Sequence, residues 1–499
     1  MKFFFILFVY ANLLASTLHL ATSTNPARLN PILATDSSSS EIASFLFNGL
    51  VKYDKDSKNI IGDLAKKFYF KDDKTLIFEL HKGVKWHDGR EFSAQDVIFT
   101  YETIISDNVI SPYGSGFRFV KSVIALDRYT VEVKYKKAYF KALETWMMGI
   151  LPFHILCNDK NLMSSSFNTN PIGTGPYKLE QLEYSKNIVI RAFDNYFEGK
   201  AKIERISFHI IADSMTRFLM LKSSQLDIGS IEPIAHERKL TKDFFSKFNL
   251  YEKISLSYTY LGFNLRLEKF KNPDVRKAIS LAIDREELVD ILFFKHAKVC
   301  TGPFLPGSNA FNSDVVAPKT DLEEAKRLLK TAGYDESHPF TFEIVTSNSS
   351  PIRPYAAQIL QHQLKKAGIV VKLRVMEWQA FLNMVVFPHK FDTVLLGWGL
   401  SPTPDPYLFW HKDSDKKGGF NLVGYNNPQV NKMIEESQSM VDREKLSKNL
   451  RKIFKLITDD NPYLFLYIPN SITAVDKKIK NIEPSLSGIW HNYKEWYKD

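Results

Sequence analysis

The sequence is poor in cysteine, with only Cys157 and Cys300 among 499 residues. Two cysteines exclude a disulfide-rich scaffold and a zinc site built from four cysteines. Blocks of five or six like charges are also missing, although 66 Lys and Arg against 56 Asp and Glu leave a net charge of +10. A mild excess spread along the chain is typical of a solvated basic surface and does not indicate nucleic-acid binding.

Motifs of common catalytic sites are absent as well. The sequence contains no G-x-S-x-G elbow, Walker loop, H-E-x-x-H or C-x-x-C. No two of the twelve histidines lie two or four residues apart, so we expect no metal site made from neighbouring histidines. We expect neither a cofactor nor an enzyme, although two carboxylates could still meet in space as in a glycosidase.

Long apolar runs are limited to the start of the chain. Lys2 precedes the apolar stretch 3–15, and small residues Ala15 and Ser16 follow. This order predicts a secretory signal at residues 1–16, cleaved near Thr17, and therefore a periplasmic protein. The run is shorter than the roughly 20 residues that span a bilayer. The alternative is a membrane anchor that stays attached.

Strands and helices alternate in the remaining sequence, which is 44% hydrophobic and 24% charged. Alternating apolar residues predict strands at 18–21, 75–80 and 129–135. Later, TFEIVTS (341–347), PYAAQILQHQLKKAG (354–368) and IVVKLRVME (369–377) predict a strand, a helix and a second, parallel strand. A buried strand at 391–398, helices at 428–439 and 443–459 and a strand at 464–469 follow. The fold class is α/β.

Capping residues mark where several helices begin. Ser37 to Ser40 could cap the apolar helix that follows, and Ser93 with Asp96 forms a capping box. Further starts are expected at Asn272 with Pro273, at Asp284 with Glu287, and at Thr320 with Glu323.

Five stretches, in the same order, resemble the extracellular solute-binding proteins of ABC importers, in the peptide/nickel family. They are LHLATSTNPARLNPILATDSSSSEIASFLFNGLVKYD, ELHKGVKWHDGREFSAQDVIFTYE (79–102), PIGTGPYKL (171–179), YLGFN with NPDVRKAISLAIDREELV, and LLGWGLSPTPDPYLFW with FNLVGYNNPQVNKMIEES. Capped helices and DG turns are common individually. The resemblance rests on their order and runs from about residue 18 to the end.

The resemblance implies a large two-lobed periplasmic binding protein of type II, with two hinge crossings and an extra subdomain on the first lobe. Lobe I would span 17–260 with the subdomain inserted at about 53–170. Lobe II would span 261–468, and 469–499 would return to lobe I. The crossings are expected near Tyr258–Asn264 and Leu466–Ser471. The ligand would be enclosed between the lobes, and the closed form would dock on a membrane permease.

Peptide-binding members hold the ligand's carboxylate with an Arg and its amino group with an Asp, because an enclosed zwitterion needs both charges matched. Arg353, in PIRPYAAQ, occupies the place of the carboxylate-binding Arg. A surface arginine near a helix start is the alternative. The family's Asp three residues after the Trp is replaced here by Ser401. Asp405 follows, either as a helix cap before Pro406 or as an amino-group ligand.

Aromatic residues complete the candidate site. Trp398 ends a buried strand, where ligands of α/β sheets tend to lie, although it could equally be a core residue. Tyr258 and Tyr260 stand beside the expected crossing and are candidate pocket aromatics. Ser38, within the Ser37–Ser40 loop, could contact ligand backbone. Trp378 and Trp410 fit the core or its rim.

Three functions are consistent with these features. The first is a monomeric receptor that captures peptides and delivers them to an ABC importer permease, with a roomy pocket that reads main chain. The second is a receptor in the same family for a metal chelate such as nickel with small organic ligands, for which His411 is the nearby soft donor. The third is an exported hydrolase. Cys157 and Cys300 should not be bonded to each other, because a bridge would join lobes that must open.

Overall fold

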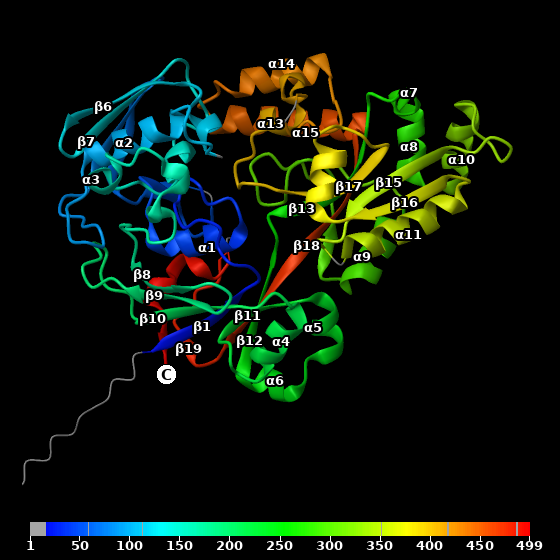
Figure 1. The fold of residues 1–499 in the computed structure, drawn as a ribbon. Coiled ribbons are helices and arrows are strands. Elements are labelled where there is room, and N and C mark those ends of the chain that lie inside the picture. Colours follow the sequence, from blue (N-terminus) through cyan, green and yellow to red (C-terminus); the bar gives the residue numbers. More distant parts are fainter. Residues whose placement is uncertain (1–15, 58, 112, 351, 417–418, 486–487) are drawn as a thin grey trace, which may run out of the picture.

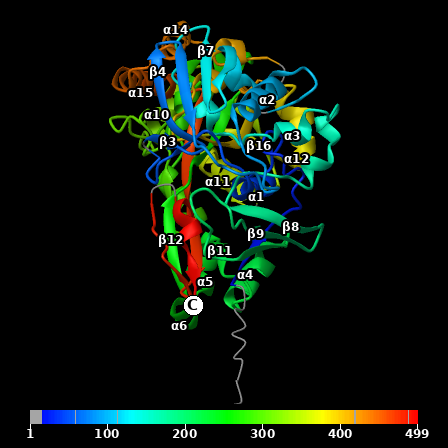
Figure 2. The same ribbon diagram turned by 90° about the vertical axis from the view of Figure 1, so that its left-hand side faces the viewer.

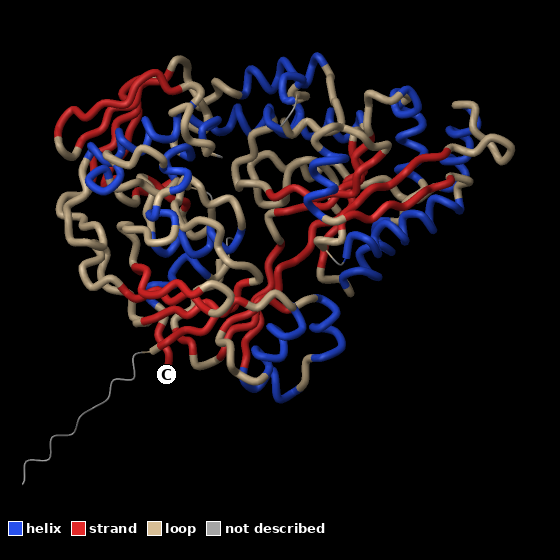
Figure 3. The backbone as a smooth tube through the Cα atoms, viewed as in Figure 1, coloured by secondary structure: helices blue, strands red, loops and turns tan. Residues whose placement is uncertain are grey.

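The computed structural model describes residues 16–57, 59–111, 113–350, 352–416, 419–485 and 488–499. The predicted signal segment, residues 1–16, lies outside this part of the chain apart from Ser16. Helices and sheets form two lobes that strands connect near the base of the molecule, in the α/β class expected (Figure 1, Figure 3). No helix within the described residues is long and apolar enough to cross a membrane.

The first lobe is built on a mixed sheet at its base. β1 pairs in parallel with β10, and β9 and β8 continue antiparallel from there. Its strands are β1 (Thr17–Thr22), β8 (Tyr177–Glu183), β9 (Asn187–Ala192) and β10 (Arg205–Ile210). Alternate residues of β1 are buried, as its sequence predicts.

Helix α1 (Ser37–Leu46) begins at Ser37, the first residue of the segment predicted to cap it. Asp36 is the N-cap, because its carboxylate accepts the Ser39 backbone N–H at 2.8 Å. The prediction that Ser37 to Ser40 cap this helix is therefore wrong, and these residues form its first turn. The longer reach of the Asp36 carboxylate satisfies a free N–H of that turn.

A small antiparallel sheet forms the subdomain, which stands at the top of the molecule (Figure 2). Helix α2 (Ala94–Ile105) contacts this sheet and starts with the predicted capping box of Ser93 and Asp96, which is confirmed. The strands, in spatial order, are β4 (Ala65–Asp72), β5 (Thr75–Leu80), β7 (Thr130–Tyr135) and β6 (Val120–Asp127). The hairpin β2 (Val51–Tyr53) and β3 (Ile60–Gly62) precedes it.

Two of the sequence motifs meet at the end of α1. His87 of KWHDG accepts the Gly173 N–H through Nδ1, and its Nε2 lies 3.0 Å from the Gly175 carbonyl oxygen. Gly175 N–H in turn donates to the carbonyl of Leu46, the last residue of α1. A Cβ on Gly173 would lie 1.8 Å from that same carbonyl oxygen, so this close approach requires glycine.

The second lobe contains a sheet in the order β18-β13-β17-β15-β16. The predicted parallel pair around a helix is confirmed as β15 (Thr341–Ser347), α11 (Ile352–Lys366) and β16 (Val370–Met376). β17 (Thr393–Gly399) runs parallel to β15 and antiparallel to β13 (Ser257–Phe263). The carboxyl ends of three neighbouring strands, at Ser347, Met376 and Gly399, therefore lie at one edge.

Helices cover both faces of this sheet. On one face pack α8 (Pro273–Leu281), α9 (Arg285–Phe293), α10 (Leu322–Thr331) and α11, and on the other α13 (Tyr407–Trp410), α14 (Pro428–Ser437) and α15 (Arg443–Asp460). Asn272 and Asp284 cap α8 and α9 as predicted. The expected cap Thr320 is wrong by one residue, because Asp321 accepts the Glu324 N–H at 2.9 Å.

The chain crosses between the lobes at two places, one a short link between two strands and the other a continuous strand. β12 (Phe248–Ile254) belongs to lobe I and β13 to lobe II, so the first crossing lies at 255–256, before the predicted range Tyr258–Asn264. β18 (Tyr463–Asp476) provides the second and extends well past the strand predicted at 464–469. It pairs with β13 and β14 (Ala297–Val299) on one side of Asn470, and with β12 and β11 (Ile228–Ile231) from Asn470 onward.

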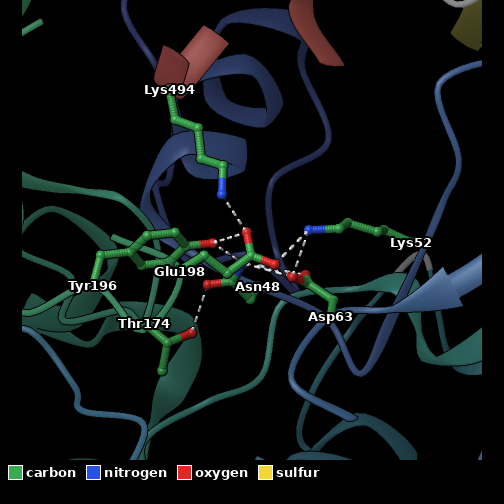
Figure 4. Close-up of polar contacts among 7 residues, drawn as sticks. All are labelled: Asn48, Lys52, Asp63, Thr174, Tyr196, Glu198 and Lys494. Atoms are coloured by element: carbon green, nitrogen blue, oxygen red, sulfur yellow. Dashed lines mark hydrogen bonds and ion pairs between the residues drawn. The ribbon is translucent and has the colours of Figure 1, made fainter. Parts of the chain in front are cut away.

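The residues after β18 lie against lobe I. Lys494 donates to Glu198, which also accepts from Lys52. Lys52 binds the buried carboxylate of Asp63 at 3.2 Å (Figure 4). The side chains of Asn48, Thr174 and Tyr196 complete this polar network, which joins the tail to the end of α1 and to the loop before β4.

The two cysteines are both free. Cys157 is exposed, whereas Cys300 is buried in lobe II, where burial raises the pKa of its thiol to about 12. The prediction that they are not bonded to each other is confirmed.

Candidate ligand-binding site

Arg353 lies in the first turn of α11, at the carboxyl edge of the lobe II sheet. Its Nη1 atom is buried and has no hydrogen-bond partner among the residues that the structure describes. Its Nη2 atom lies 3.7 Å from the position that a Cβ on Gly397 would take. Burial lowers the pKa of the guanidinium, yet an arginine remains charged. A buried N–H of a charged group without an acceptor is costly, so this position is suited to an anionic partner.

Trp398 lies on the opposite face of the same strand end. Its ring stacks on Tyr260 at 6.1 Å between centroids, and Tyr260 stacks on Tyr463 at 3.9 Å. Because successive residues of a strand point to opposite faces, Gly397 faces Arg353 while Trp398 faces the aromatic stack. Only the backbone of the strand end separates the two candidate residues. A ligand that touches both must cross this edge.

The two tyrosines predicted beside the crossing lie deeper than Trp398. Tyr258 and Tyr260 are 2% and 0% exposed and belong to the core. Tyr258 packs on Phe465 and Tyr260, and burial raises the pKa of both phenols well above 10. Both lie on β13 in the core of lobe II. Tyr260 packs directly against Trp398, and Tyr258 packs against Tyr260.

Ser401 and Asp405 lie where the lobes meet opposite the hinge. Ser401 is exposed, and its hydroxyl donates to the Thr403 carbonyl at 2.6 Å and accepts from Lys141 at 3.3 Å. Asp405 accepts the Tyr407 N–H at 3.0 Å, the Gln438 side-chain amide at 3.1 Å and Arg118 at 3.4 Å. The N-cap of α13 is Pro406, not Asp405 as the cap alternative predicted. Asp405 accepts the N–H of the first residue of α13 and binds Arg118 of the other lobe at the same time.

Three residues at this junction were not identified from the sequence. Lys141, Arg118 and Tyr53 lie in lobe I or its subdomain and contact residues 401–405 of lobe II. Burial lowers the pKa of Lys141, whereas Asp405 and Glu144 oppose this shift. More than 250 residues separate each from its partner, and no local pattern marks such pairs.

A cavity of about 410 Å³ opens at the same junction. Lys141, Arg118, Ser401 and Asp405 line it together with Tyr53 and Tyr139. A second contact, between Arg443 and Glu144 at 3.3 Å, also joins the lobes nearby. The lobes are therefore in contact both at the hinge and at the far end.

Ser38 and His411 are engaged in local structure. The Ser38 hydroxyl is buried and bonds to the hydroxyls of Thr22 and Thr24, which fastens the end of β1 to α1. His411 is 1% exposed; its Nε2 lies 3.0 Å from Glu435, and its Nδ1 accepts the Asp413 N–H. Neither ring nitrogen of His411 is available to a metal chelate. Within the described residues, no group of three or more His, Cys, Asp or Glu is placed to hold a metal ion.

Comparison with protein families identifies the chain. Residues 59–420 match the model of the bacterial extracellular solute-binding proteins, family 5. The chain belongs to this family. As a family 5 solute-binding protein of the peptide/nickel type, it is a binding protein and not an enzyme, so the hydrolase interpretation is set aside.

Individual relatives agree with this assignment. The chain is 31% identical to the oligopeptide-binding protein AppA of Bacillus subtilis, over 95% of this chain and 90% of that one. The structure of AppA in complex with a nonapeptide is similar with a TM-score of 0.84 and 30% identity, covering 97% of this chain and 99% of that one. NikZ of Campylobacter jejuni in complex with Ni(L-His) is similar with a TM-score of 0.85 and 28% identity, covering 97% of this chain and 100% of that one.

Proposed function

We propose that this family 5 protein is a periplasmic receptor that encloses peptides between its lobes and delivers them to the permease of an ABC importer. The observation that carries the proposal is the buried Nη1 of Arg353, which has no acceptor and lies at the carboxyl edge of the lobe II sheet. A peptide carboxylate supplies the planar, bidentate partner that a guanidinium fits. Similarity to AppA supports the same ligand class.

The remaining site residues take separate parts in this proposal. Trp398 offers an apolar wall on the other face of the strand end, supported by Tyr260 and Tyr258. Ser401 and Asp405 line the cavity at the far end, and Ser38 holds the segment after β1. Asp405 is already bound by Arg118 and Gln438, so a fixed anchor for the ligand's amino group is not supported. Peptides of several residues, read mainly through their main chain, fit such a site.

Export and oligomeric state form part of the proposal. Residues 1–16 act as a signal that is cleaved near Thr17, and the mature protein works as a monomer. β1 starts at Thr17 and is integral to the base sheet, so cleavage much later in the chain would remove a strand of that sheet. N-terminal sequencing of the exported protein should therefore start close to Thr17, and retention of Met1 would contradict this.

Receptor function for a nickel chelate is the second candidate, because NikZ is a structural relative that binds Ni(L-His). Isothermal calorimetry with peptides of two to six residues, beside nickel with histidine, separates the two. We expect peptide heats with affinities that vary little with the central side chains, because water fills unused pocket space. Heat from the nickel complex alone, with none from any peptide, would replace the peptide proposal by the chelate one. Native mass spectrometry of the purified protein gives an independent reading of the co-purified ligand.

A further inference from the structure

Two histidines from different lobes meet beside the hinge. His236 lies in α5 (Pro233–Lys239) of lobe I, and His296 lies between α9 and β14 of lobe II. Nδ1 of His236 is 3.0 Å from Nε2 of His296, and the ring centroids are 4.3 Å apart. In Figure 1, α5 lies below α9, next to the point where β18 passes between the lobes. This contact of two rings therefore joins the lobes at their pivot.

The same contact is tied to both crossings of the chain. Nδ1 of His296 is 2.9 Å from Oε1 of Glu252, near the end of β12 and just before the first crossing. Asn470, at the second crossing, donates its side-chain amide to that Glu252 oxygen at 2.6 Å and its backbone N–H to the His296 carbonyl at 2.9 Å. A row of polar contacts thus runs from Asn470 through Glu252 and His296 to His236.

The backbone before His296 is strained. Phe294 and Lys295 have φ angles of 51° and 70°, in the left-handed region that residues with a side chain rarely adopt. The His296 N–H donates to the Phe293 carbonyl at 2.8 Å, and the guanidinium of Arg238 lies 5.6 Å from the centroid of the Phe294 ring. Such strain persists only where the surroundings hold it, and it often accompanies segments that switch.

Proton counting limits the charge that the two rings can carry together. The Glu252 carboxylate only accepts, so Nδ1 of His296 carries a hydrogen. The contact between the rings needs one more hydrogen, on either His296 or His236. A single imidazolium at His296 satisfies both bonds, because it donates to Glu252 and to His236. With both rings protonated, two N–H groups oppose each other, and the rings must part.

The surrounding charges do not favour the second proton. Burial lowers the pKa of His236, and His296 adds to this shift, whereas Glu252 and Glu237 oppose it. The pair therefore takes up its second proton below the ordinary histidine pKa of 6.5. Besides Glu252, the charged residues on α5, its N-cap, β12, β14 and the turn before His296 are Glu232, Glu237, Arg238, Lys239, Lys253, Lys295 and Lys298. Most of them are basic and cannot offset a further positive charge.

We propose that His236 and His296 form a proton-operated latch at the hinge, which helps to hold the lobes closed at neutral pH and loosens when both rings are protonated. The inference rests on the proposed receptor function, in which the lobes open to release the ligand, and adds a regulation to it. The loosened form binds one more proton than the latched form, so a fall in pH favours opening. Acidification then promotes release of the bound ligand.

A second pair of histidines provides a matched control. His19 on β1 and His209 on β10 are 3.1 Å apart between Nδ1 and Nε2, and their rings stack at 5.4 Å between centroids. Burial lowers the pKa of both rings. Because β1 and β10 are neighbours in the lobe I sheet, this pair does not link the lobes.

The test is the distance between two spin labels, one on each lobe, measured in the protein without ligand from about pH 7.5 to about pH 5. Exposed Cys157 takes one label and Lys326→Cys, on exposed α10, takes the other, whereas Cys300 is buried. The distance should shift to longer values at the acidic end. His236→Gln keeps a group that can hydrogen-bond but does not titrate, and it should abolish the shift. His19→Gln should keep it.

A distance that does not change with pH would overturn the latch, as would an equal shift in the protein with and without His236→Gln. Loss of the shift in His19→Gln as well would assign it to acid destabilisation and would also overturn the latch. Calorimetry with tetra-alanine adds a second reading. Affinity should fall with acidification by at most about tenfold per pH unit for one proton, and less steeply in His236→Gln.

The same peptide is used for every variant, so its own titration cancels in the comparison. An affinity that falls equally with and without His236→Gln would contradict the latch and leave the receptor function intact. Absence of peptide binding at any pH, together with a distance shift that depends on His236, would defeat the peptide proposal and leave the latch in place.

Discussion

Arg353 and its surroundings determine what can occupy the carboxyl edge of the lobe II sheet. Its neighbours are backbone at Gly397 and the phenols of Tyr260 and Tyr467, whose electrostatic influence opposes the effect of burial on its pKa. None of these neighbours supplies a negative charge at neutral pH. None of the named neighbours neutralises the guanidinium, so the contribution of Arg353 to the free energy of binding an anion can be measured by replacing it.

Replacement of Arg353 by Ala should weaken peptide binding by about 2–5 kcal/mol, because the ligand carboxylate is then enclosed without a partner. The melting temperature without ligand should change little, since Nη1 makes no hydrogen bond to any described residue. Calorimetry measures the first quantity and scanning calorimetry the second. An affinity equal to that of the unmodified protein would remove Arg353 from the site.

His87 should make stability depend on pH. Burial lowers the pKa of His87 from 6.5 to about 4, so between these values the unfolded chain binds a proton that the folded protein does not. The free energy of unfolding should therefore fall as pH falls from about 6.5 to about 4, by at most about 3 kcal/mol from this residue. Urea unfolding across this range should show a smaller pH slope in His87→Gln than in the exposed control His338→Gln. Equal slopes in the two variants would contradict the assignment.

At the residue scale, the sequence supplied candidate residues for the site but not the contacts that each of them makes. Arg353 became a candidate through its resemblance to the family's carboxylate-binding Arg, and its place in the first turn of α11 is close to the expected loop. Asp405 was left between cap and ligand; in the structure Pro406 is the N-cap, and the Asp405 carboxylate binds the Tyr407 N–H and Arg118, which is 287 residues away in the sequence. Contacts between lobes depend on how the lobes are placed, and a local sequence pattern carries no information about that.

The segment 173–175 packs closely against the end of α1 in lobe I. Gly173→Ala should lower the free energy of unfolding by about 3 kcal/mol, because a Cβ would overlap the Leu46 carbonyl and the backbone of α1 must move. Urea unfolding of the variant measures this loss. Gly399→Ala is the matched control and should be near neutral, because a Cβ there meets no atom within 4 Å. Similar stability of the two variants would show that the end of α1 adapts easily.

Elements with a clear period were predicted well and their ends less well. In the β15-α11-β16 unit, apolar residues recur with a strand period of two and then a helix period of 3.6. A strand, a helix and a second strand in this order predict parallel pairing, which the structure has. Thr320 and Asp321 are adjacent and both residue types are good caps, so the pattern did not distinguish them and the predicted cap was one residue early. β18 was predicted as a short strand because Pro469 interrupts its pattern, whereas the structure continues it through the crossing to Asp476.

For the whole molecule, the shared strand predicts a single unfolding transition. β18 pairs with strands of both lobes, so neither sheet stays complete once the other loses it. Scanning calorimetry of the protein without ligand should give one peak, and far-ultraviolet circular dichroism and tryptophan fluorescence should report the same midpoint. Two separated transitions would mean that each lobe keeps its core without the shared strand.

The position of β18 near the end of the chain also sets the order in which the protein can fold. Until residues 463–476 have been synthesised, β13 lacks one neighbour in lobe II, and β11 and β12 lack the strand that lies between them in lobe I. Contacts this distant in sequence form late, since the chain between them must close first. Both lobes therefore remain incomplete while most of the polypeptide is still being made. In the export route proposed above, such a chain would reach the channel with both sheets still open and would complete them only after crossing it.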